Sequence, residues 1–291
     1  MLKPFTLHEP STVAEASSLL RQYGESARLY AGGTELVLVM KHGLAHYGHV
    51  VNVKRIPALG GLRLDGDVLR IGAAATHRAI ERDDRIRDRL PVLSTLERGV
   101  ANVRVRNVGT LGGNLAFAEP HADPGTLLLA LGARVRAQRD ERVRHIPVEE
   151  FFIDAYTTAL EPDEVLVEVE VPLPLPGTAA AFLKFGFLER PSVNVAAVVS
   201  VSDGLVREAR LAVGCVGPKP VRCHRAEAGL AGVPVRDLPA AAEAAGAEAS
   251  REIDPLDDLH GSAEYKRHIA GVLVQRALAA AAEGLNGGGG G

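Results

Sequence analysis

Two adjacent glycines, Gly32 and Gly33, constrain the fold of this chain more than any other feature. They follow the run 28–30 (Arg-Leu-Tyr) and precede the run 36–41 (Leu-Val-Leu-Val-Met-Lys), so they join a predicted strand to a predicted short, buried helix. Glycine lets a backbone turn tightly and approach a ligand closely. A helix start adds unpaired N–H groups and a positive dipole end, which suit a phosphate, and Thr34 can cap the helix. A turn that merely connects the two elements would have the same sequence pattern, so this stretch alone does not distinguish a connecting turn from a phosphate-binding loop.

A second glycine loop occurs at residues 106–114, which read Arg-Asn-Val-Gly-Thr-Leu-Gly-Gly-Asn. The segment 119–124 (Glu-Pro-His-Ala-Asp-Pro) follows it. Two such loops could close on opposite sides of one elongated, anionic ligand. Neither loop has the G-x-G-x-x-G or the G-x-x-x-x-G-K-[ST] pattern, so a Rossmann nicotinamide site and a Walker nucleotide site both lose support.

Composition excludes several classes of protein. The length of 291 residues predicts two domains or one large one. Hydrophobic residues make up 46% of the chain and charged residues 24%, as in ordinary globular proteins. The net charge of −3 gives no sign of a nucleic-acid or membrane partner. No run reaches the roughly 18 apolar residues of a membrane span, and no signal peptide is visible. We therefore expect a cytoplasmic protein, with the mixed-charge run 81–89 as a solvated face.

Cysteines and histidines give no sign of a metal centre. The two cysteines, Cys215 and Cys223, cannot supply the four thiolates of an ordinary iron–sulfur cluster. They could pair with each other, but in a cytosolic chain buried free thiols are the favoured interpretation. The histidines between 42 and 49 lack a metal-ligand spacing, and the carboxylates of 254–258 precede a helix as a solvated cap. We predict no metal site and no catalytic side chain on this chain.

The N-terminal segment has the pattern of a small parallel sheet. Residues 5–8 read as a strand, and Thr12 begins a capping box for a helix that Gly24 ends. Residues 49–53 (His-Val-Val-Asn-Val) form another predicted strand after the first glycine loop. This strand–helix–strand–helix–strand order predicts parallel pairing, with the loop at the carboxyl end of a strand. Open α/β sheets usually hold ligands there.

From residue 62 onward the pattern changes. Residues 62–71 are two alternating strands across an Asp-Gly turn, which is a hairpin signal. Predicted helical stretches at 77–101 and 123–131 follow, with predicted strands at 134–137 and 165–171. These elements predict a second subdomain whose sheet is either mixed or antiparallel.

Residues 172–177 (Pro-Leu-Pro-Leu-Pro-Gly) form the best linker in the chain, because prolines prevent regular ladder pairing. Strands are predicted beyond it at 180–187, 193–202 and 205–214, and helices at 223–231, 238–250 and 261–283. The fold class that follows is α+β: two N-terminal subdomains, then a C-terminal domain of a three-stranded antiparallel sheet with a helical bundle. The predicted domain boundaries are 1–175, 176–285, and a flexible glycine tail at 286–291.

The two loops also resemble a known family. Residues 31–35 followed by Met40-Lys41, and then residues 110–114, look like the double FAD signature of the FAD-binding (medium) subunit of molybdenum hydroxylases. This is the carbon monoxide dehydrogenase and xanthine dehydrogenase family. The likeness continues through 151–166 and 261–267 and covers roughly residues 2–283. It implies a PCMH-type FAD-binding domain, a carbon monoxide dehydrogenase flavoprotein-like C-terminal domain, and FAD as the cofactor of this chain.

The resemblance also implies which residues bind FAD. The first loop would offer backbone N–H groups to the pyrophosphate, and the second loop would form the opposite wall by the same glycine logic. Asp123 matches a family acid that contacts ribityl or ribose hydroxyls; its alternative role is a helix N-cap. Leu166 and Lys184 match positions near the flavin ring, where an ammonium stabilises reduced flavin, although Lys184 could also be an exposed strand lysine. The predicted cofactor-binding set is Ala31, Gly32, Gly33, Thr34, Glu35, Leu36, Thr110, Gly112, Gly113, Asn114, Asp123, Leu166 and Lys184.

Three positions depart from the family pattern. Glu35 stands where relatives often have Asp, so its role would be its backbone N–H. The loop 190–194 lacks the aromatic residue or Asp of relatives, which leaves open how it covers the flavin ring. Thr34 stands where carbon monoxide enzymes more often have His or Gln, which favours a different substrate at molybdenum.

The function that the resemblance implies is electron transfer. A large subunit with molybdopterin would oxidise the substrate with water. A small subunit with [2Fe–2S] clusters would pass the electrons to FAD, for an acceptor such as NAD, oxygen or a quinone. We expect a dimer of heterotrimers, with the partner docking beside a cleft that Leu166 and Lys184 line. A free-standing FAD oxidoreductase is the alternative, although the alanine-rich C-terminal domain shows no substrate pocket, and a regulatory flavoprotein is a weaker one.

Overall fold

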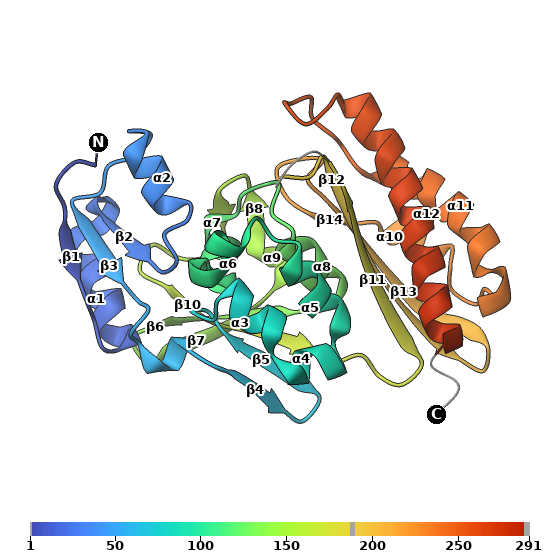
Figure 1. Ribbon diagram of the computed structural model, residues 1–291, viewed down its shortest axis with the longest axis horizontal. Coiled ribbons are helices and arrows are strands. Elements are labelled where there is room, and N and C mark those ends of the chain that lie inside the picture. The colour runs from blue at the N-terminus through green and yellow to red at the C-terminus, as the bar shows by residue number, and fades with distance from the viewer. Residues whose placement is uncertain (1, 187–189, 288–291) are drawn as a thin grey trace. The chain divides into compact units, whose positions relative to one another are not determined.

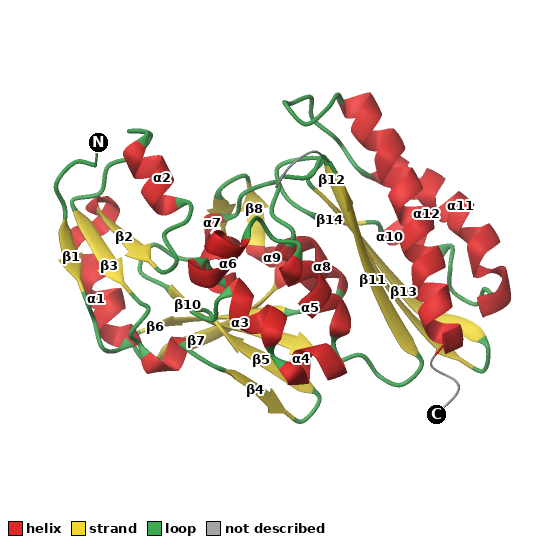
Figure 2. Ribbon diagram, viewed as in Figure 1, coloured by secondary structure: helices red, strands yellow, loops and turns green. Residues whose placement is uncertain are grey.

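The computed structural model describes residues 2–186 and 190–287, and the chain divides into two compact units (Figure 1). Each unit is assembled from three separate stretches of the chain. The first unit contains Met1–Asp83, Glu97–Ala118 and Ala133–Pro172, and the second contains Asp84–Leu96, Glu119–Gly132 and Leu173–Gly291. Helices and strands both contribute throughout, which confirms the α+β class (Figure 2). The domain boundaries expected at 175 and 285 stay a prediction.

The first unit begins with the predicted parallel sheet. Thr12 accepts a hydrogen bond from the backbone N–H of Glu15 at 3.1 Å and so caps α1 (Val13–Tyr23). Gly24 ends this helix with a φ of 51°. The sheet has the order β1-β3-β2, with both pairings parallel, and its strands are β1 (Thr6–His8), β3 (His49–Asn52) and β2 (Ala27–Tyr30). The strand–helix–strand prediction is confirmed.

Helix α2 (Leu36–Lys41) follows the first glycine loop, and it is more exposed than predicted. Met40 is its one buried residue, and Leu38 is 49% exposed. Glu35 occupies the N-cap position without a side-chain capping hydrogen bond, so Thr34 does not cap the helix. The prediction of a buried, threonine-capped helix is wrong, because six residues make less than two turns and face the core with few side chains.

A five-stranded sheet forms the centre of the first unit. Its strands, in spatial order, are β4 (Leu62–Asp65), β5 (Val68–Gly72), β10 (Val165–Pro172), β6 (Arg134–Arg139) and β7 (Arg142–Pro147). All four pairings are antiparallel, which decides between the two sheet types that the sequence left open. The hairpin turns at Gly66, as predicted.

Several short elements were not predicted. They are β7, α9 (Val148–Phe151), β8 (Phe152–Asp154) and β9 (Thr157–Thr158). Strand β7 is an edge strand with only Ile146 buried, so its sequence lacks the apolar alternation that marks a half-buried strand.

Charged side chains cover one face of this sheet. Glu168 and Glu170, on the central strand β10, are each only 2% exposed. Arg63 lies 2.7 Å from Glu168, and His145 lies 3.1 Å from Glu170. Burial alone would raise the pKa of Glu170, but His145 and Arg70 outweigh it and hold that pKa below its ordinary value.

The predicted helical stretch 77–101 is divided into shorter helices, in part because Pro91 cannot continue a helix. The mixed-charge run 81–89 is mostly exposed, but Glu81 is buried against Arg106 and Ile86 is fully buried, which corrects the solvated-face prediction. The helices before and after the second glycine loop are α3 (His77–Arg82), α4 (Asp84–Arg89), α5 (Pro91–Arg98), α6 (Val103–Val108) and α7 (Leu111–Phe117).

One hydrophobic core joins both sheets of the first unit. It combines Val13 and Leu20 of α1 with Val51 of β3 and with Val165 and Val167 of β10. The core therefore fixes the parallel sheet, which carries the first glycine loop, against the antiparallel sheet.

The second unit is built on another antiparallel sheet. It includes the predicted three-strand meander and a fourth strand of two residues, which is too short to show a sequence pattern. The end of the predicted strand, at residue 187, lies outside the described residues. In spatial order the strands are β11 (Thr178–Phe185), β12 (Val193–Ser202), β13 (Leu205–Gly214) and β14 (Val221–Arg222).

Helices α11 and α12 lie side by side and pack with the sheet of the second unit (Figure 1). Helix α12 runs four residues beyond the predicted end at 283 and enters the predicted glycine tail, whose residues 288–291 lie outside the described part. No helix among the described residues is both long and apolar enough to span a bilayer. The helices of this unit not yet given are α8 (Pro124–Ala130), α10 (His224–Ala228), α11 (Leu238–Glu252) and α12 (Ala263–Gly287).

Both cysteines lie in this second unit, where they are free and buried as predicted. Burial raises the pKa of Cys223 to about 12, and it raises the pKa of Cys215 well above its ordinary value. A thiol that stays protonated is a poor nucleophile, so these side chains act as core residues.

Candidate cofactor site

The first glycine loop, residues 31–35, leaves backbone donors free. Among the described residues, no acceptor lies within hydrogen-bond reach of the N–H groups of Gly32, Gly33 and Thr34. Gly33 has a φ of +71°, and a Cβ there would lie 2.3 Å from the Tyr30 ring, so the turn needs glycine. Successive free N–H groups in a turn form a concave anion site. This loop can therefore hold a phosphate without a cationic side chain.

Gly32 brings the two glycine loops into direct contact. A Cβ on Gly32 would lie 2.4 Å from the Val108 carbonyl oxygen and 2.6 Å from the Gly109 Cα. On the same side, the Thr34 hydroxyl lies 3.5 Å from the point that a Cβ on Gly109 would occupy. The sequence predicted loops on opposite sides of a ligand. At this point they instead pack against each other within the first unit.

The second loop uses its backbone donors inside the protein. The N–H groups of Leu111 and Gly112 donate to carbonyl oxygens in the segment 73–75, each at 3.0 Å. The Gly113 N–H donates to the side-chain oxygen of Thr110 at 3.0 Å, which makes Thr110 the N-cap of α7. The prediction that this loop offers amides by the same glycine logic is therefore wrong at these residues, because pairing with a neighbouring segment consumes them.

The two glycines of the second loop face different surroundings. A Cβ on Gly112 would lie 2.5 Å from the Ala73 Cβ and 2.7 Å from the Ala73 oxygen, and Gly112 is buried. Gly113 is exposed, and a Cβ there would meet only the Thr110 hydroxyl at 2.8 Å and Ala31 at 3.9 Å. Gly112 is required by packing within the protein, and its predicted contact with the cofactor stays a prediction. Gly113 presents the open surface.

Asn114 follows directly and carries an unpaired acceptor. Its side-chain oxygen is buried and has no hydrogen-bond partner among the described residues. A buried acceptor without a donor costs free energy, and such atoms are rare in native structures. An FAD hydroxyl group could supply the missing donor. The free amides of the first loop, the open Gly113 and this orphaned oxygen together fit a cofactor with a pyrophosphate and sugar hydroxyls.

Asp123 lies in the second unit at the centre of a buried hydrogen-bond network. Its two carboxylate oxygens accept from the Lys184 ammonium at 2.6 Å and from the Asn194 amide at 2.9 Å. Thr126 donates to the Asn194 side-chain oxygen at 2.8 Å. Burial raises the pKa of the Asp123 carboxyl above its ordinary value, although Lys184 opposes the shift.

This network bears on two alternatives left by the sequence. Asp123 does occupy the N-cap position of α8, but its carboxylate makes no capping hydrogen bond there and binds Lys184 and Asn194 instead. Lys184 is an exposed residue of β11, but its side chain, 30% exposed, is ion-paired with Asp123, so it is more than a solvated strand lysine. Whether either side chain contacts FAD stays a prediction.

The other predicted residues divide between the loop region and the central sheet. Ala31 and Glu35 belong to the first loop and Leu36 follows it, and all three are half-buried. Leu166 lies on β10 with 5% of its surface exposed, and it pairs with Ala137 of β6. Its predicted place near the flavin ring stays a prediction.

A second polar cluster in the second unit surrounds His121. Its Nδ1 lies 3.3 Å from Glu119, and its Nε2 lies 3.1 Å from Asp258. The buried Lys266 also binds Asp258, and although burial opposes the shift, Lys266 contributes to a lowered pKa for that carboxyl. The sequence predicted only solvated capping carboxylates there. Asp257 does cap α12, but Asp258 is held by ion pairs.

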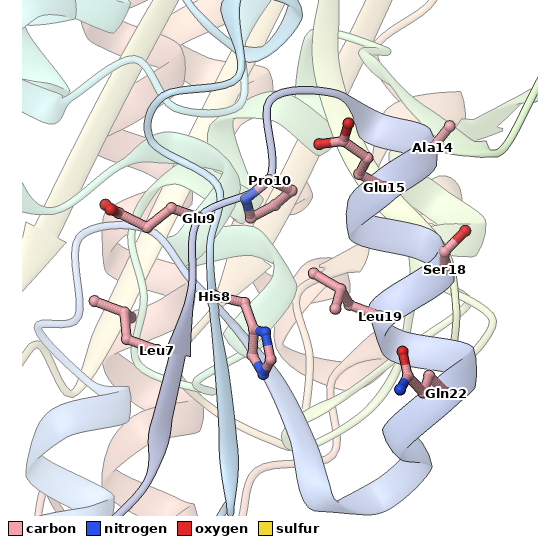
Figure 3. Close-up of a pocket in the computed structure, with 9 residues that line it drawn as sticks. All are labelled: Leu7, His8, Glu9, Pro10, Ala14, Glu15, Ser18, Leu19 and Gln22. Atoms are coloured by element: carbon pink, nitrogen blue, oxygen red, sulfur yellow. The ribbon is translucent and has the colours of Figure 1, made fainter.

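A hollow between β1 and α1 lies apart from these features (Figure 3). Two of its polar side chains are already paired, because Glu15 accepts from Ser11 and His8 binds His49 at 3.0 Å. We assign no ligand to it. The residues that line it, none of which belongs to a glycine loop, are Leu7, His8, Glu9, Pro10, Ala14, Glu15, Ser18, Leu19 and Gln22.

Sequence reasoning missed several residues of these networks. Asn194 had a usable signal, since it is a lone amide between two valines near the start of a mostly apolar strand. No sequence signal marks His77 and Glu97, whose side chains bind each other at 2.6 Å. Twenty residues separate them, and neither lies in a motif.

Comparison with known proteins gives matches along nearly the whole chain. Residues 3–174 match the family described as the FAD binding domain in molybdopterin dehydrogenase, and residues 190–281 match the CO dehydrogenase flavoprotein C-terminal domain. The chain is 35% identical to the carbon monoxide dehydrogenase medium chain of Hydrogenophaga pseudoflava, over 97% of this chain and 98% of the relative. The solved structure of that enzyme superposes with a TM-score of 0.93, again over 97% and 98% of the two chains.

Two further relatives show other enzymes of the group. A putative xanthine dehydrogenase FAD-binding subunit of Escherichia coli is 29% identical over 96% of this chain and 97% of the relative. The structure of quinoline 2-oxidoreductase from Pseudomonas putida superposes with a TM-score of 0.91 at 29% identity, over 98% of this chain and 99% of that chain.

Proposed function

This chain belongs to the FAD-binding family of molybdopterin dehydrogenases, and from that premise we propose that it is the electron-transfer subunit of a molybdenum hydroxylase. Electrons enter from the [2Fe–2S] clusters of a small partner subunit, which receives them from a large subunit that carries molybdopterin. When bound, FAD supplies the redox chemistry, taking up these electrons for an external acceptor. The dimer of heterotrimers and the cytoplasmic location belong to the same proposal.

The observation that carries the proposal is the set of free amides at Gly32, Gly33 and Thr34. These donors bind the FAD pyrophosphate. A turn of backbone N–H groups concentrates partial positive charge without long side chains that would have to be ordered. The carboxylate of Glu35 is not needed there and would repel a phosphate.

Asn114 and Gly113 bind the cofactor next to this loop. The unpaired Asn114 oxygen accepts a hydrogen bond from an FAD hydroxyl, and the absence of a side chain at Gly113 leaves room for that contact. Each hydrogen bond of this kind contributes about 1 kcal/mol to net binding.

In the second unit, we propose that the Lys184 ammonium serves the flavin ring. A positive charge there stabilises the negative charge that the ring gains on reduction. Asp123 holds Lys184 at 2.6 Å and fixes the position of the ammonium. With Leu166, these residues complete the proposed cofactor-binding set.

Purification of the untagged protein from its native cells tests the function. We expect it to elute with two partner subunits, and the complex to contain iron, molybdenum and FAD. Denaturation should release the FAD, because no covalent link is proposed. Elution as a single flavoprotein that reduces an acceptor with its own substrate would support a free-standing oxidoreductase instead. A protein without flavin after reconstitution would contradict both functions.

A further inference from the structure

A buried, hydrogen-bonded histidine–carboxylate pair that the proposed function does not use lies behind the second glycine loop. His77 begins α3 and Glu97 lies near the end of α5. The His77 Nδ1 is 2.6 Å from a Glu97 carboxylate oxygen, and the two side chains are 3% and 0% exposed. Two buried ionisable groups in one place need a physical reason, because taking charge out of water is costly.

His77 contacts the second loop at Gly109. Its backbone N–H donates to the Gly109 carbonyl at 3.0 Å, and its ring carbon Cδ2 lies 3.3 Å from the point that a Cβ on Gly109 would occupy. Because Cδ2 lies across the ring from Nδ1, Glu97 holds one side of the imidazole and Gly109 meets the other.

Gly109 in turn supports the first loop. Gly32 packs on the Gly109 Cα, and the Thr34 hydroxyl lies 3.5 Å from the point that a Cβ on Gly109 would occupy. A continuous line of contacts therefore runs from Glu97 through His77 and Gly109 to the loop that carries the free amides. All of these residues belong to the first unit.

Strand-like hydrogen bonds between the segments 73–77 and 109–112 fix the second loop, and the bond from the His77 N–H to the Gly109 carbonyl is the last of them. Among the described residues, this strand-like pairing does not continue beyond Gly109. The Gly109 N–H also donates to the Val105 carbonyl at 2.6 Å, so α6 holds Gly109 through the backbone. Among side chains, the imidazole of His77 lies nearest to the point that a Cβ on Gly109 would occupy.

Stability alone does not account for the pair. The second carboxylate oxygen of Glu97 is buried and has no hydrogen-bond partner among the described residues. Apolar residues of similar volume often replace a buried polar or ionic pair at no loss of stability, or with a gain. In some proteins buried polar groups are retained because they fix one conformation, and we apply that explanation here.

We propose that His77 and Glu97 are positioning residues for the pyrophosphate site. Glu97 fixes the imidazole, the imidazole fixes Gly109, and Gly109 keeps the amides of residues 32–34 aligned on the phosphates. The inference rests on the proposed FAD site but concerns residues that do not themselves touch the cofactor.

Binding of ADP and FAD to the full-length apoprotein, measured by calorimetry together with thermal midpoints, tests the proposal. ADP carries the pyrophosphate without the flavin. We expect His77→Leu to weaken ADP and FAD by the same factor, about tenfold. His77→Asn, whose amide nitrogen can replace Nδ1, should restore most of the affinity.

The double variant His77→Leu with Glu97→Leu separates positioning from packing. We expect its thermal midpoint to return toward that of the parent while its ADP affinity stays low. As a matched control, Glu164→Gln removes a buried carboxylate that binds Arg144 at 2.6 Å in the same unit, and it should lower the midpoint without changing ADP affinity.

Recovery of both stability and ADP affinity in the double variant would overturn the proposal and reduce the pair to packing. Parental ADP affinity in His77→Leu would overturn it equally. A parent protein that binds neither ADP nor FAD would instead overturn the cofactor assignment at the first loop, and this inference with it.

Discussion

The two glycine loops have similar sequences but differ in the hydrogen bonding of their backbone N–H groups. In the first loop, the amides of Gly32 and Gly33 have no acceptor among the described residues. In the second loop, the amides of Leu111, Gly112 and Gly113 are all consumed by the protein. Buried N–H groups need an acceptor, whereas the half-buried N–H groups of the first loop are available to a ligand or to water. Under the proposed function the first loop therefore binds the cofactor, and the second loop acts as a brace. A Gly-Gly motif alone does not distinguish the two roles.

The largest effect is expected from Gly32→Val, at the point where the loops meet. The new Cβ would lie 2.4 Å from the Val108 oxygen, so the first loop must move away from the second. We expect flavin content after reconstitution to fall below detection, or FAD affinity to drop more than a hundredfold. Absorbance of released flavin per polypeptide measures this.

Gly60→Val is the matched control for that variant. Gly60 lies in the same unit with a φ of −93°, and a Cβ there would meet its nearest neighbour at an ordinary 3.5 Å. Full flavin content is expected. If Gly32→Val also retains full flavin, the first loop is not the binding loop.

The second loop should separate into a structural glycine and a ligand-facing glycine. Gly112→Val forces a side chain into Ala73, and overpacking of this kind costs about 3 kcal/mol. Gly113→Val meets only the Thr110 hydroxyl, so the apoprotein should stay folded but lose flavin. Urea unfolding and flavin content measure the two effects. Equal flavin occupancy in Gly113→Val and the parent would remove Gly113 from the site.

Asn114→Ala should weaken FAD binding less than the glycine variants do, and it should not destabilise the apoprotein. Removing a buried acceptor that has no partner should leave the apoprotein as stable as the parent or slightly more stable. Loss of one hydrogen bond to the cofactor should weaken FAD by about fivefold, which corresponds to roughly 1 kcal/mol. Fluorescence quenching on FAD titration measures the affinity. Unchanged affinity with higher stability would show that the oxygen has no cofactor partner.

The smallest expected effect lies on the charged face of the central sheet. The pKa of Glu170 is lowered in the folded protein, so its contribution is present above the ordinary carboxyl pKa and is lost as pH falls through the lowered value. Glu170→Gln should be less stable than the parent at pH 7, and the difference should shrink below about pH 4. FAD affinity at pH 7 should not change. Thermal midpoints across pH test this, and a constant difference would contradict the assignment.

Much of the fold was predictable because local chemistry defines it. The capping threonine before α1, the glycine after it and the Asp-Gly turn of the hairpin each act within a few residues. Elements without such signals were missed, among them the edge strand β7, in which Arg142 and Arg144 occupy the positions on the Ile146 face that an apolar alternation would fill.

The site was less predictable because its hydrogen bonds join residues far apart in the chain. The motif at residues 110–114 indicates a ligand loop, but the acceptors that consume its amides lie in the segment 73–75. Asn194 reaches Asp123 across seventy-one residues. No local pattern contains either pairing. The resemblance indicated the correct family, but it did not distinguish the loop with free amides from the loop whose amides the protein uses.

The chain passes from one unit to the other after residues 83, 96, 118, 132 and 172, and this threading has a consequence for splitting the protein. A cut in the proline linker would leave α8 on the N-terminal fragment, although α8 packs on β12 and β13 of the C-terminal fragment. Separate expression of the two fragments would deprive the second unit of part of its interior. A nick in the intact protein would leave the two pieces bound, as in fragment complementation.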